Sequence, residues 1–220
     1  MSKKVVVSVS SMPAGRNMSA QLEFIARAGV YGADMYHLDV MDGVFTKYKT
    51  IDYEYFEQLR EKSPLLFDCH LMISNPQKVI KKYINSPVNI ITVHYESFQN
   101  TEDLIKVLKQ IKAGDKMVGL AIDLETKVDV IDPIIKYLDL VLIMSVKAGK
   151  GGQEFDNSAI KKIKYVRKLN PEILIEVDGG INDKTAPLCV KAGADILAAG
   201  SYVYNNDTYD AIATLKGKNG

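Results

Sequence analysis

The stretch Tyr36-His37-Leu38-Asp39-Val40-Met41-Asp42-Gly43 alternates apolar and polar residues from Tyr36 to Val40. In an extended chain the apolar residues fall on one face and the imidazole and carboxylate on the other, the period of a β-strand. An exposed edge strand would show the polar face to water. If that face points into the protein, His37 and Asp39 need a charge partner or a metal ion, because an unpaired buried ion is costly.

Strand-like apolar runs occur at eight places, namely 5–10, 35–40, 65–72, 89–94, 117–123, 139–146, 173–178 and 195–199. The segments between them have helical spacing, so the pattern indicates right-handed βαβ units around a parallel sheet. Eight such units in 220 residues predict a single-domain α/β protein, a (β/α)₈ TIM barrel over residues 1–220. The alternative, an open doubly wound sheet, more often stops at five or six strands.

Three helix ends are predicted from capping residues. The helical pattern of 20–29 closes on Gly29, a C-cap-like glycine. Asn182 is the expected N-cap of a helix over 183–192, and Asn157 or Ser158 that of a helix ending at Leu169.

Composition narrows the class of protein. The chain is 47% hydrophobic with a net charge of +1 and no long run of one sign, so we expect neither nucleic-acid nor membrane binding. The apolar run after the first four residues is too short for a signal peptide, and no run reaches transmembrane length. Two cysteines argue against a disulfide scaffold or a cysteine zinc site and fit a reducing cytoplasm.

Histidines and carboxylates fall on strands two, three and seven. His37 and Asp39 share one face of the second predicted strand, Asp68 and His70 one face of the third, and Glu176 and Asp178 one face of the seventh. Since active sites of such barrels lie at the C-terminal strand ends, these residues predict a divalent site for Zn²⁺, Mn²⁺ or Fe²⁺. The alternative is a polar network inside the barrel without a metal. Asp68 and Glu176 lie one layer deeper and are expected to orient the other groups.

Glycines follow the last three predicted strands, at 149–152, at 179–180 and at Gly200-Ser201. Loops after the seventh and eighth strands form the recurrent phosphate site of such barrels, and the first glycine run could close as a lid. Glycine also serves ordinary turns. Carboxylates on opposite sides of the mouth could remove a proton from one face of a carbon beside a carbonyl and return it to the other, which is epimerisation.

The chain resembles the ribulose-phosphate 3-epimerases and their relatives, the allulose-6-phosphate 3-epimerases. The resemblance rests on residues 37–43, 68–72, 142–146, 151–153, 176–182, 192–195 and 199–201. It implies a phosphorylated ketose as substrate, a homo-oligomer, and one divalent ion per chain (Zn, Mn, Fe or Co) held by His37, Asp39, His70 and Asp178. It further implies Asp39 and Asp178 as the acid/base pair and does not make His94 a ligand.

The expected substrate-binding residues are Ser10, Met41, His70, Met72, Met144, Gly149, Gly151, Gly152, Gly179, Gly180, Gly200 and Ser201. For the three methionines, ordinary core packing is an open alternative.

The chain departs from the family pattern in the loops that would touch the sugar. Where the family commonly has Asn-Pro-Gly-Phe-Gly-Gly-Gln, this chain has Lys147-Ala148-Gly149-Lys150-Gly151-Gly152-Gln153, and Lys47 lies in the loop after the second strand. D-Ribulose 5-phosphate is the default substrate, with another ketose phosphate, such as allulose 6-phosphate or an acidic sugar, as the alternative. Two other hypotheses remain. One is a β-keto acid decarboxylase, but such lyases usually have Asp-x-Lys-x-x-Asp at a strand end, and Asp39-Val40-Met41-Asp42 contains no lysine. The other is a catalytically inactive phosphate-binding paralogue.

Overall fold

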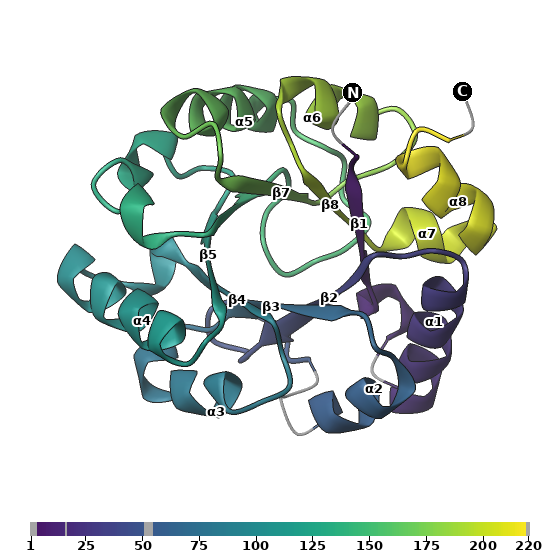
Figure 1. Cartoon of the computed structure of the whole chain (residues 1–220), viewed down its shortest axis with the longest axis horizontal. Coiled ribbons are helices and arrows are strands. Elements are labelled where there is room, and N and C mark those ends of the chain that lie inside the picture. Colours follow the sequence, from purple (N-terminus) through teal and green to yellow (C-terminus); the bar gives the residue numbers. More distant parts are fainter. Residues whose placement is uncertain (1–3, 16, 51–54, 219–220) are drawn as a thin grey trace.

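The computed structural model describes residues 4–15, 17–50 and 55–218. These residues form a closed barrel of parallel strands in the order β1 to β8, with helices around it (Figure 1), so the predicted (β/α)₈ barrel is confirmed. The strands are β1 (Val6–Ser10), β2 (Met35–Met41), β3 (Leu66–Met72), β4 (Ile90–His94), β5 (Met117–Ile122), β6 (Leu140–Met144), β7 (Leu174–Asp178) and β8 (Ile196–Ala199).

The α-helices are α1 (Met18–Val30), α2 (Phe56–Lys62), α3 (Ile80–Ile84), α4 (Thr101–Ala113), α5 (Ser158–Leu169), α6 (Ala186–Ala192), α7 (Ser201–Asn205) and α8 (Thr208–Leu215). Short 3₁₀ helices are η1 (Met12–Ala14), η3 (Pro76–Lys78), η4 (Tyr95–Ser97), η5 (Val128–Ile131) and η6 (Ile135–Tyr137). Between β5 and β6 the connection consists of η5 and η6, which differs from the helical connection expected between every pair of strands.

Two of the predicted helix ends are wrong. Helix α1 continues past Gly29 to Val30, because Gly29 serves a close approach instead: a Cβ there would collide with the hydroxyl of Tyr36, which donates a hydrogen bond to the carbonyl of Ile25 at 2.6 Å. Helix α6 begins at Ala186, since the side chain of Asn182 accepts hydrogen bonds from the backbone of residues 184 and 185 in a turn before the helix.

The third helix starts as predicted, with Asn157 at the N-cap position of α5. The side chain of Asn157 makes no capping hydrogen bond. Asp156 Oδ1 instead accepts from the backbone N–H of Ser158 at 2.7 Å.

The barrel interior contains an apolar cluster and a polar one. The apolar cluster includes the first residues of β2, β4, β6 and β8, namely Met35, Ile90, Leu140 and Ile196, and continues along β6 through Leu142 and Met144. Further along β2 and β3, register pairs His37 with Asp68 and Asp39 with His70. Because alternate residues of a strand point inward, this register stacks the polar residues toward the C-terminal end of the barrel.

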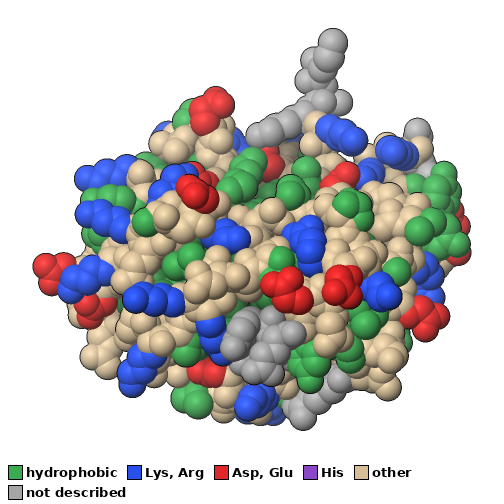
Figure 2. Space-filling model, turned by 60° about the horizontal axis from the view of Figure 1, so that its bottom comes forward, with side chains coloured by type: hydrophobic (Ala, Val, Ile, Leu, Met, Phe, Trp, Pro, Cys, Tyr) green, Lys and Arg blue, Asp and Glu red, His purple; other side chains and the backbone are tan. Residues whose placement is uncertain are grey.

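The outer surface carries charges of both signs. Figure 2 shows Lys and Arg side chains interspersed with Asp and Glu over one face, and no histidine is visible there. All three histidines belong to the described residues and have 0% exposure. No helix within the described ranges is long and apolar enough to cross a membrane.

Candidate active site

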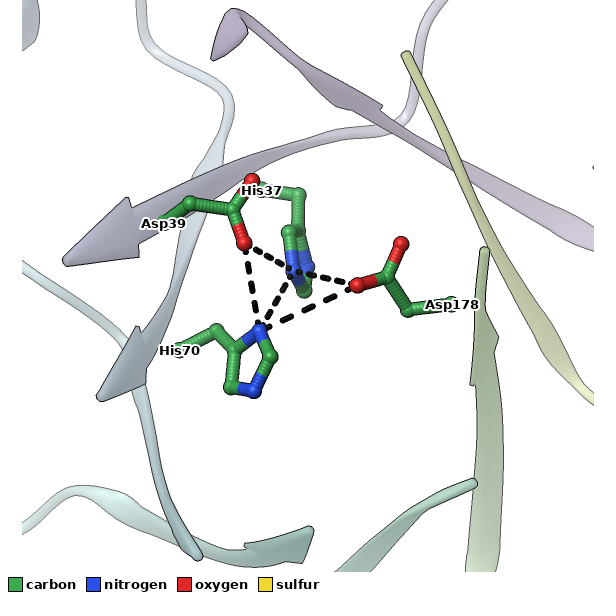
Figure 3. A group of neighbouring side chains, drawn as sticks. All are labelled: His37, Asp39, His70 and Asp178. Atoms are coloured by element: carbon green, nitrogen blue, oxygen red, sulfur yellow. Dashed lines mark hydrogen bonds and ion pairs between the residues drawn. The ribbon is translucent and has the colours of Figure 1, made fainter. Parts of the chain in front are cut away.

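Four side chains from three strands converge inside the barrel (Figure 3). His37 Nε2 and His70 Nδ1 are 3.2 Å apart, and Asp39 Oδ1 lies 3.4 Å from the first and 3.2 Å from the second. Asp178 Oδ2 lies 3.9 Å from each of the two nitrogens. The register of β2 with β3 and the position of β7 therefore bring together the four residues named as ligands from the sequence.

The hydrogen bonds that His37 and His70 make away from this cluster determine which ring nitrogen is protonated, and so which nitrogen offers a lone pair to the cluster. His37 Nδ1 donates to Asp68 Oδ2 at 2.7 Å, which leaves Nε2 for the cluster. On the other side, His94 Nδ1 donates to Glu96 Oε2 at 3.0 Å, so His94 Nε2 accepts from His70 Nε2 at 2.7 Å. His70 Nδ1 then also presents a lone pair, and two facing lone pairs need a cation or a proton between them.

The donor set fits a divalent metal ion. All four ligand atoms lie within 4.8 Å of one another. Around a tetrahedral Zn²⁺ with bonds of about 2.0–2.2 Å, ligand atoms are about 3.3–3.6 Å apart, close to the separations found here. Imidazole nitrogen with carboxylate oxygen suits Zn, Mn, Fe or Co, and each histidine has the carboxylate or histidine partner behind it that metal-ligating histidines usually have.

The two carboxylates of the cluster have opposite pKa shifts. Burial alone would raise the pKa of Asp39, but the charge of His37 and hydrogen bonds from His37 and His70 hold it well below its ordinary value. Burial raises the pKa of Asp178 to about 7. A pair of acids whose environments separate their pKa values is the arrangement in which one group accepts a proton and the other donates one.

The two imidazoles also differ. Burial lowers the pKa of His70 to about 4, so this ring is neutral, as a metal ligand must be. Burial opposes the charged form of His37 too, but Asp39 and Asp68 raise its pKa well above the ordinary value. The carboxylates around His37 thus favour positive charge where a bound cation would lie.

Asp68 and Glu176 lie behind His37, one layer below the cluster, as expected. Glu176 Oε1 is 3.3 Å from His37 Nδ1, and both carboxylates have 0% exposure. Burial and the neighbouring Asp68 raise the pKa of Glu176 well above its ordinary value. The hydrogen bond to Asp68 holds the ring of His37 in place, and Glu176 approaches the same nitrogen without a hydrogen bond of its own.

A cavity of about 370 Å³ opens above the cluster at the C-terminal end of the barrel. It is lined by Asp39 and Asp178 and by all but one of the expected substrate-binding residues, namely Ser10, Met41, Met72, Met144, Gly149, Gly151, Gly152, Gly179, Gly180, Gly200 and Ser201. The exception is His70, which is fully buried below the cavity floor. Ser10 donates a hydrogen bond to Asp39 Oδ2 at 2.8 Å and so fixes the carboxylate oxygen that faces away from the cluster.

The glycines after β7 let the backbone of the cavity wall pack closely against neighbouring residues. Gly179 and Gly180 have φ of 110° and 59°, which favours glycine. A Cβ on Gly180 would lie 2.6 Å from the backbone nitrogen of Phe155, and one on Gly179 would collide with Val146. Backbone N–H groups in such turns form concave sites for anions.

The Ribulose-phosphate 3 epimerase family model matches residues 6–204 of the chain. The chain belongs to this family. It is 40% identical over 194 residues to a ribulose-phosphate 3-epimerase of Bacillus subtilis, covering 84% of this chain and 87% of that protein. Ribulose-phosphate 3-epimerases of Aquifex aeolicus, 35% identical with 82% of each chain covered, and of Schizosaccharomyces pombe, 36% identical with 82% and 79% covered, are also similar. The predictions of the family and of an isomerase are therefore confirmed.

Solved structures of other enzymes share the barrel. A 3-keto-L-gulonate-6-phosphate decarboxylase from Vibrio cholerae superposes with a TM-score of 0.74 at 12% identity, covering 98% of this chain and 97% of that one. A 3-hexulose-6-phosphate synthase superposes with a TM-score of 0.69 at 17% identity, covering 98% and 99%. At these identities the likeness shows the fold alone.

In this family member the loop between β6 and α5 lies over the cavity, and in Figure 1 it is the green segment over the centre of the barrel. Gln153 Nε2 donates to the carbonyls of Lys147 and Lys150 at 2.8 and 2.7 Å, which closes the loop on itself. Sequence reasoning gave Gln153 no role, although it ends a motif that carries the family resemblance.

Several further lining residues were missed from the sequence, among them Met12, Pro13, Asn182, Tyr202, Asn205 and Asn206. Most of them follow β1 and β8, where no alternation or glycine pair signals an inward-facing side chain. The only available signal was their position directly after the C-terminal strand ends.

Proposed function

We propose that this chain is a metal-dependent phosphoketose 3-epimerase that interconverts D-ribulose 5-phosphate and D-xylulose 5-phosphate. One observation carries the proposal: two carboxylates, Asp39 and Asp178, line the same cavity from opposite sides of a cluster of metal-type ligands. Inversion at a carbon beside a carbonyl needs one base and one acid on its two faces.

Asp39, held ionised by His37 and His70, removes the proton from C3 on one face, and Asp178 delivers a proton to the other face. In the reverse direction the two residues exchange roles. A divalent cation held by His37, Asp39, His70 and Asp178 would act as a Lewis acid that polarises the substrate carbonyl and favours the enediolate.

The remaining lining residues position the substrate. Met41, Met72 and Met144 are buried, at 1–2% exposure, and present apolar surface to the cavity. This surface excludes water from the planar intermediate, where a low dielectric strengthens the electrostatic contribution of the two carboxylates. Ser10 keeps Asp39 oriented through its 2.8 Å hydrogen bond.

The loops after β7 and β8 are proposed to hold the substrate's phosphate. Gly179, Gly180, Gly200 and Ser201 all line the cavity, and loops in these positions form the phosphate sites of many such barrels. The loop with Gly149, Gly151 and Gly152 lines the same cavity beside Ser201, since a Cβ on Gly151 would lie 3.6 Å from the Ser201 hydroxyl.

A second candidate is epimerisation of another ketose phosphate. It is favoured by Lys150, which lines the cavity where the family commonly has phenylalanine. The decarboxylase reading has less support, because Asp42 accepts hydrogen bonds from the backbone and hydroxyl of Ser74 at 2.8 and 2.9 Å and is engaged in holding two loops together. Both acidic residues of the pair are present, which disfavours the silent paralogue.

We also propose a cytoplasmic homo-oligomer. Both cysteines are free and buried, as suits a reducing compartment. Val30 at the end of α1 is 82% exposed, and the exposed rings of Tyr31, just after α1, of Tyr204 on α7 and of Tyr209 on α8 add apolar surface for a second copy.

The proposal is tested by incubating the protein with D-ribulose 5-phosphate and following D-xylulose 5-phosphate with a coupled assay. We expect turnover that is lost on chelation and restored by a single divalent metal at one equivalent per chain. Full activity of a protein shown by elemental analysis to be metal-free would contradict the metal dependence, and absence of turnover with any metal would contradict the substrate.

A further inference from the structure

A second cavity, of about 340 Å³, lies beside the first. The two share the side chains of Met12, Asp39 and Met41 and the loop residues 149–151. The second cavity therefore adjoins the proposed base, Asp39, and no residue of the loops after β7 and β8, the proposed phosphate site, lines it. Its size is within the range of small-molecule sites, about 300–1,000 Å³.

One wall of this second cavity is the segment after β2, which folds back on the end of that strand. Lys49 pairs with Asp42 in an antiparallel bridge. The hydroxyl of Thr50 donates to the carbonyl of Asp39 at 2.6 Å and accepts from the backbone of Met41 at 2.9 Å. These contacts fix Tyr48, Lys49 and Thr50 against the strand that carries the proposed base.

The loop after β6 forms the roof. A Cβ on Gly149 would lie 2.6 Å from the methyl group of Thr46, and one on Gly151 would lie 3.2 Å from the end of Met12. The loops after β1, β2 and β6 thus meet at the second cavity, and Lys150, on the loop after β6, lines both cavities.

The charged residues that line the second cavity are Asp39, Lys49 and Lys150. Ser11 and Gln21, also in its wall, are hydrogen-bonded to each other at 3.1 Å. Among the described residues no ion pair or hydrogen bond engages the ammonium of Lys49 or Lys150, or the hydroxyl of Tyr48. Lys49 and Lys150 are exposed, and together with Tyr48 they surround one space with two unpartnered cations and a hydroxyl donor, which suits an anion.

Two other lysines near the mouth do not take part. Lys147 lines neither cavity, and only its backbone carbonyl is engaged, by Gln153. Lys47 also lines neither cavity, and its ammonium lies 5.2 Å from the ring centre of Tyr48. They are matched controls, because they carry the same charge on the same two loops.

We propose that the second cavity is a subsite for an anionic group at the end of the substrate opposite its phosphate, with Lys49 and Lys150 as the specificity-determining residues. The proposal rests on the epimerase function proposed above. A ketose bound with its phosphate at the loops after β7 and β8 and its C3 between Asp39 and Asp178 has its C1 end toward this cavity. The preferred substrate is then a ketose phosphate with a carboxylate or a second phosphate at C1.

The test compares two matched pairs of compounds by NMR detection of solvent deuterium incorporated at C3. D-Ribulose 1,5-bisphosphate is compared with D-ribulose 5-phosphate, and 2-keto-D-gluconate 6-phosphate, which has a carboxylate at C1, with D-fructose 6-phosphate. We expect kcat/KM to be at least tenfold higher for the anionic member of one pair, which also identifies the anion. In Lys49→Met and in Lys150→Met this preference should fall about 10- to 100-fold, mainly through KM, as expected for a lost charged hydrogen bond.

Lys47→Met and Lys147→Met should keep the preference of the wild type. If, in both pairs, the compound without an anionic group at C1 exchanges equally fast or faster, the subsite is overturned while the epimerase function stays intact. A loss of preference of the same size in all four variants would also overturn it, because the preference would then come from the overall positive potential at the barrel mouth and not from Lys49 and Lys150. Exchange with none of the four compounds would overturn the epimerase function itself.

Discussion

Replacing His94 by phenylalanine tests how the site sets the protonation of its ligands. His94 Nε2 accepts the hydrogen bond from His70 Nε2 at 2.7 Å, and the rings of His94 and His70 stack with centroids 4.9 Å apart. Phenylalanine keeps a ring against His70 and Phe45 but removes the acceptor. His94 is not one of the four proposed ligands, so the stoichiometry at saturating metal should remain one per chain.

The expected magnitude follows from the group left unpaired. His70 is 0% exposed, so its Nε2–H cannot find water easily once His94 is gone. An unsatisfied buried donor costs about 1–3 kcal/mol, which corresponds to about a 5- to 150-fold loss of metal affinity. Loss of the partner behind a metal-ligating histidine typically costs about 10- to 100-fold, so both lines of reasoning agree.

The assay is competition for Zn²⁺ or Mn²⁺ with a chelator of known affinity, combined with thermal unfolding of the metal-free protein. Glu96→Gln is a milder change in the same chain of hydrogen bonds: it replaces one of two accepting carboxylate oxygens, which bind His94 Nδ1 on one side and the Asp123 backbone and Thr126 hydroxyl on the other, but leaves His94 Nε2 in place as the acceptor for His70. We expect a smaller drop in affinity. An affinity of His94→Phe within twofold of the wild type, in a protein that unfolds at the same temperature, would refute the assignment of His70 Nδ1 as the free lone pair.

Asp39→Asn and Asp178→Asn should each lower kcat by about 10²- to 10⁴-fold while circular dichroism stays unchanged, since each removes one proton carrier, and near-native turnover of either variant would contradict its role. His37→Ala and His70→Ala should lower the bound metal measured by elemental analysis, and full metal content in both would rule out the proposed ligand set. Burial raises the pKa of the Cys189 thiol to about 12, so a thiol reagent at pH 8 should label this residue only after unfolding, and rapid labelling of the folded protein would contradict its burial.

Much of the fold follows from local patterns. The eight predicted strands match β1 to β8 with ends that differ by no more than two residues, because period-2 alternation and short apolar runs are properties of the strand itself. The helix ends depended on distant residues. Gly29 was read as a cap because its role comes from Tyr36, a contact with the following strand that the helix sequence does not contain.

The candidate site divides in the same way. The sequence motifs on three separate strands were enough to name the four candidate ligands, and the barrel brings these residues together: His37, Asp39, His70 and Asp178. The second cavity could not be found from the sequence, because it depends on how three loops meet. Of the lysines singled out from the sequence only Lys150 lines a cavity, and it is joined there by Lys49, which no motif indicated.

Deuterium labelling during the first turnover tests the central claim, two-base epimerisation, most directly. D-Ribulose 5-phosphate is mixed with an excess of the metal-loaded protein in D₂O, and the D-xylulose 5-phosphate formed is analysed by mass spectrometry. With Asp39 and Asp178 acting on opposite faces of C3, every product molecule should carry one solvent deuterium from the first turnover. Product that retains the hydrogen of the substrate would mean that a single base moves the same proton across, and would contradict the account.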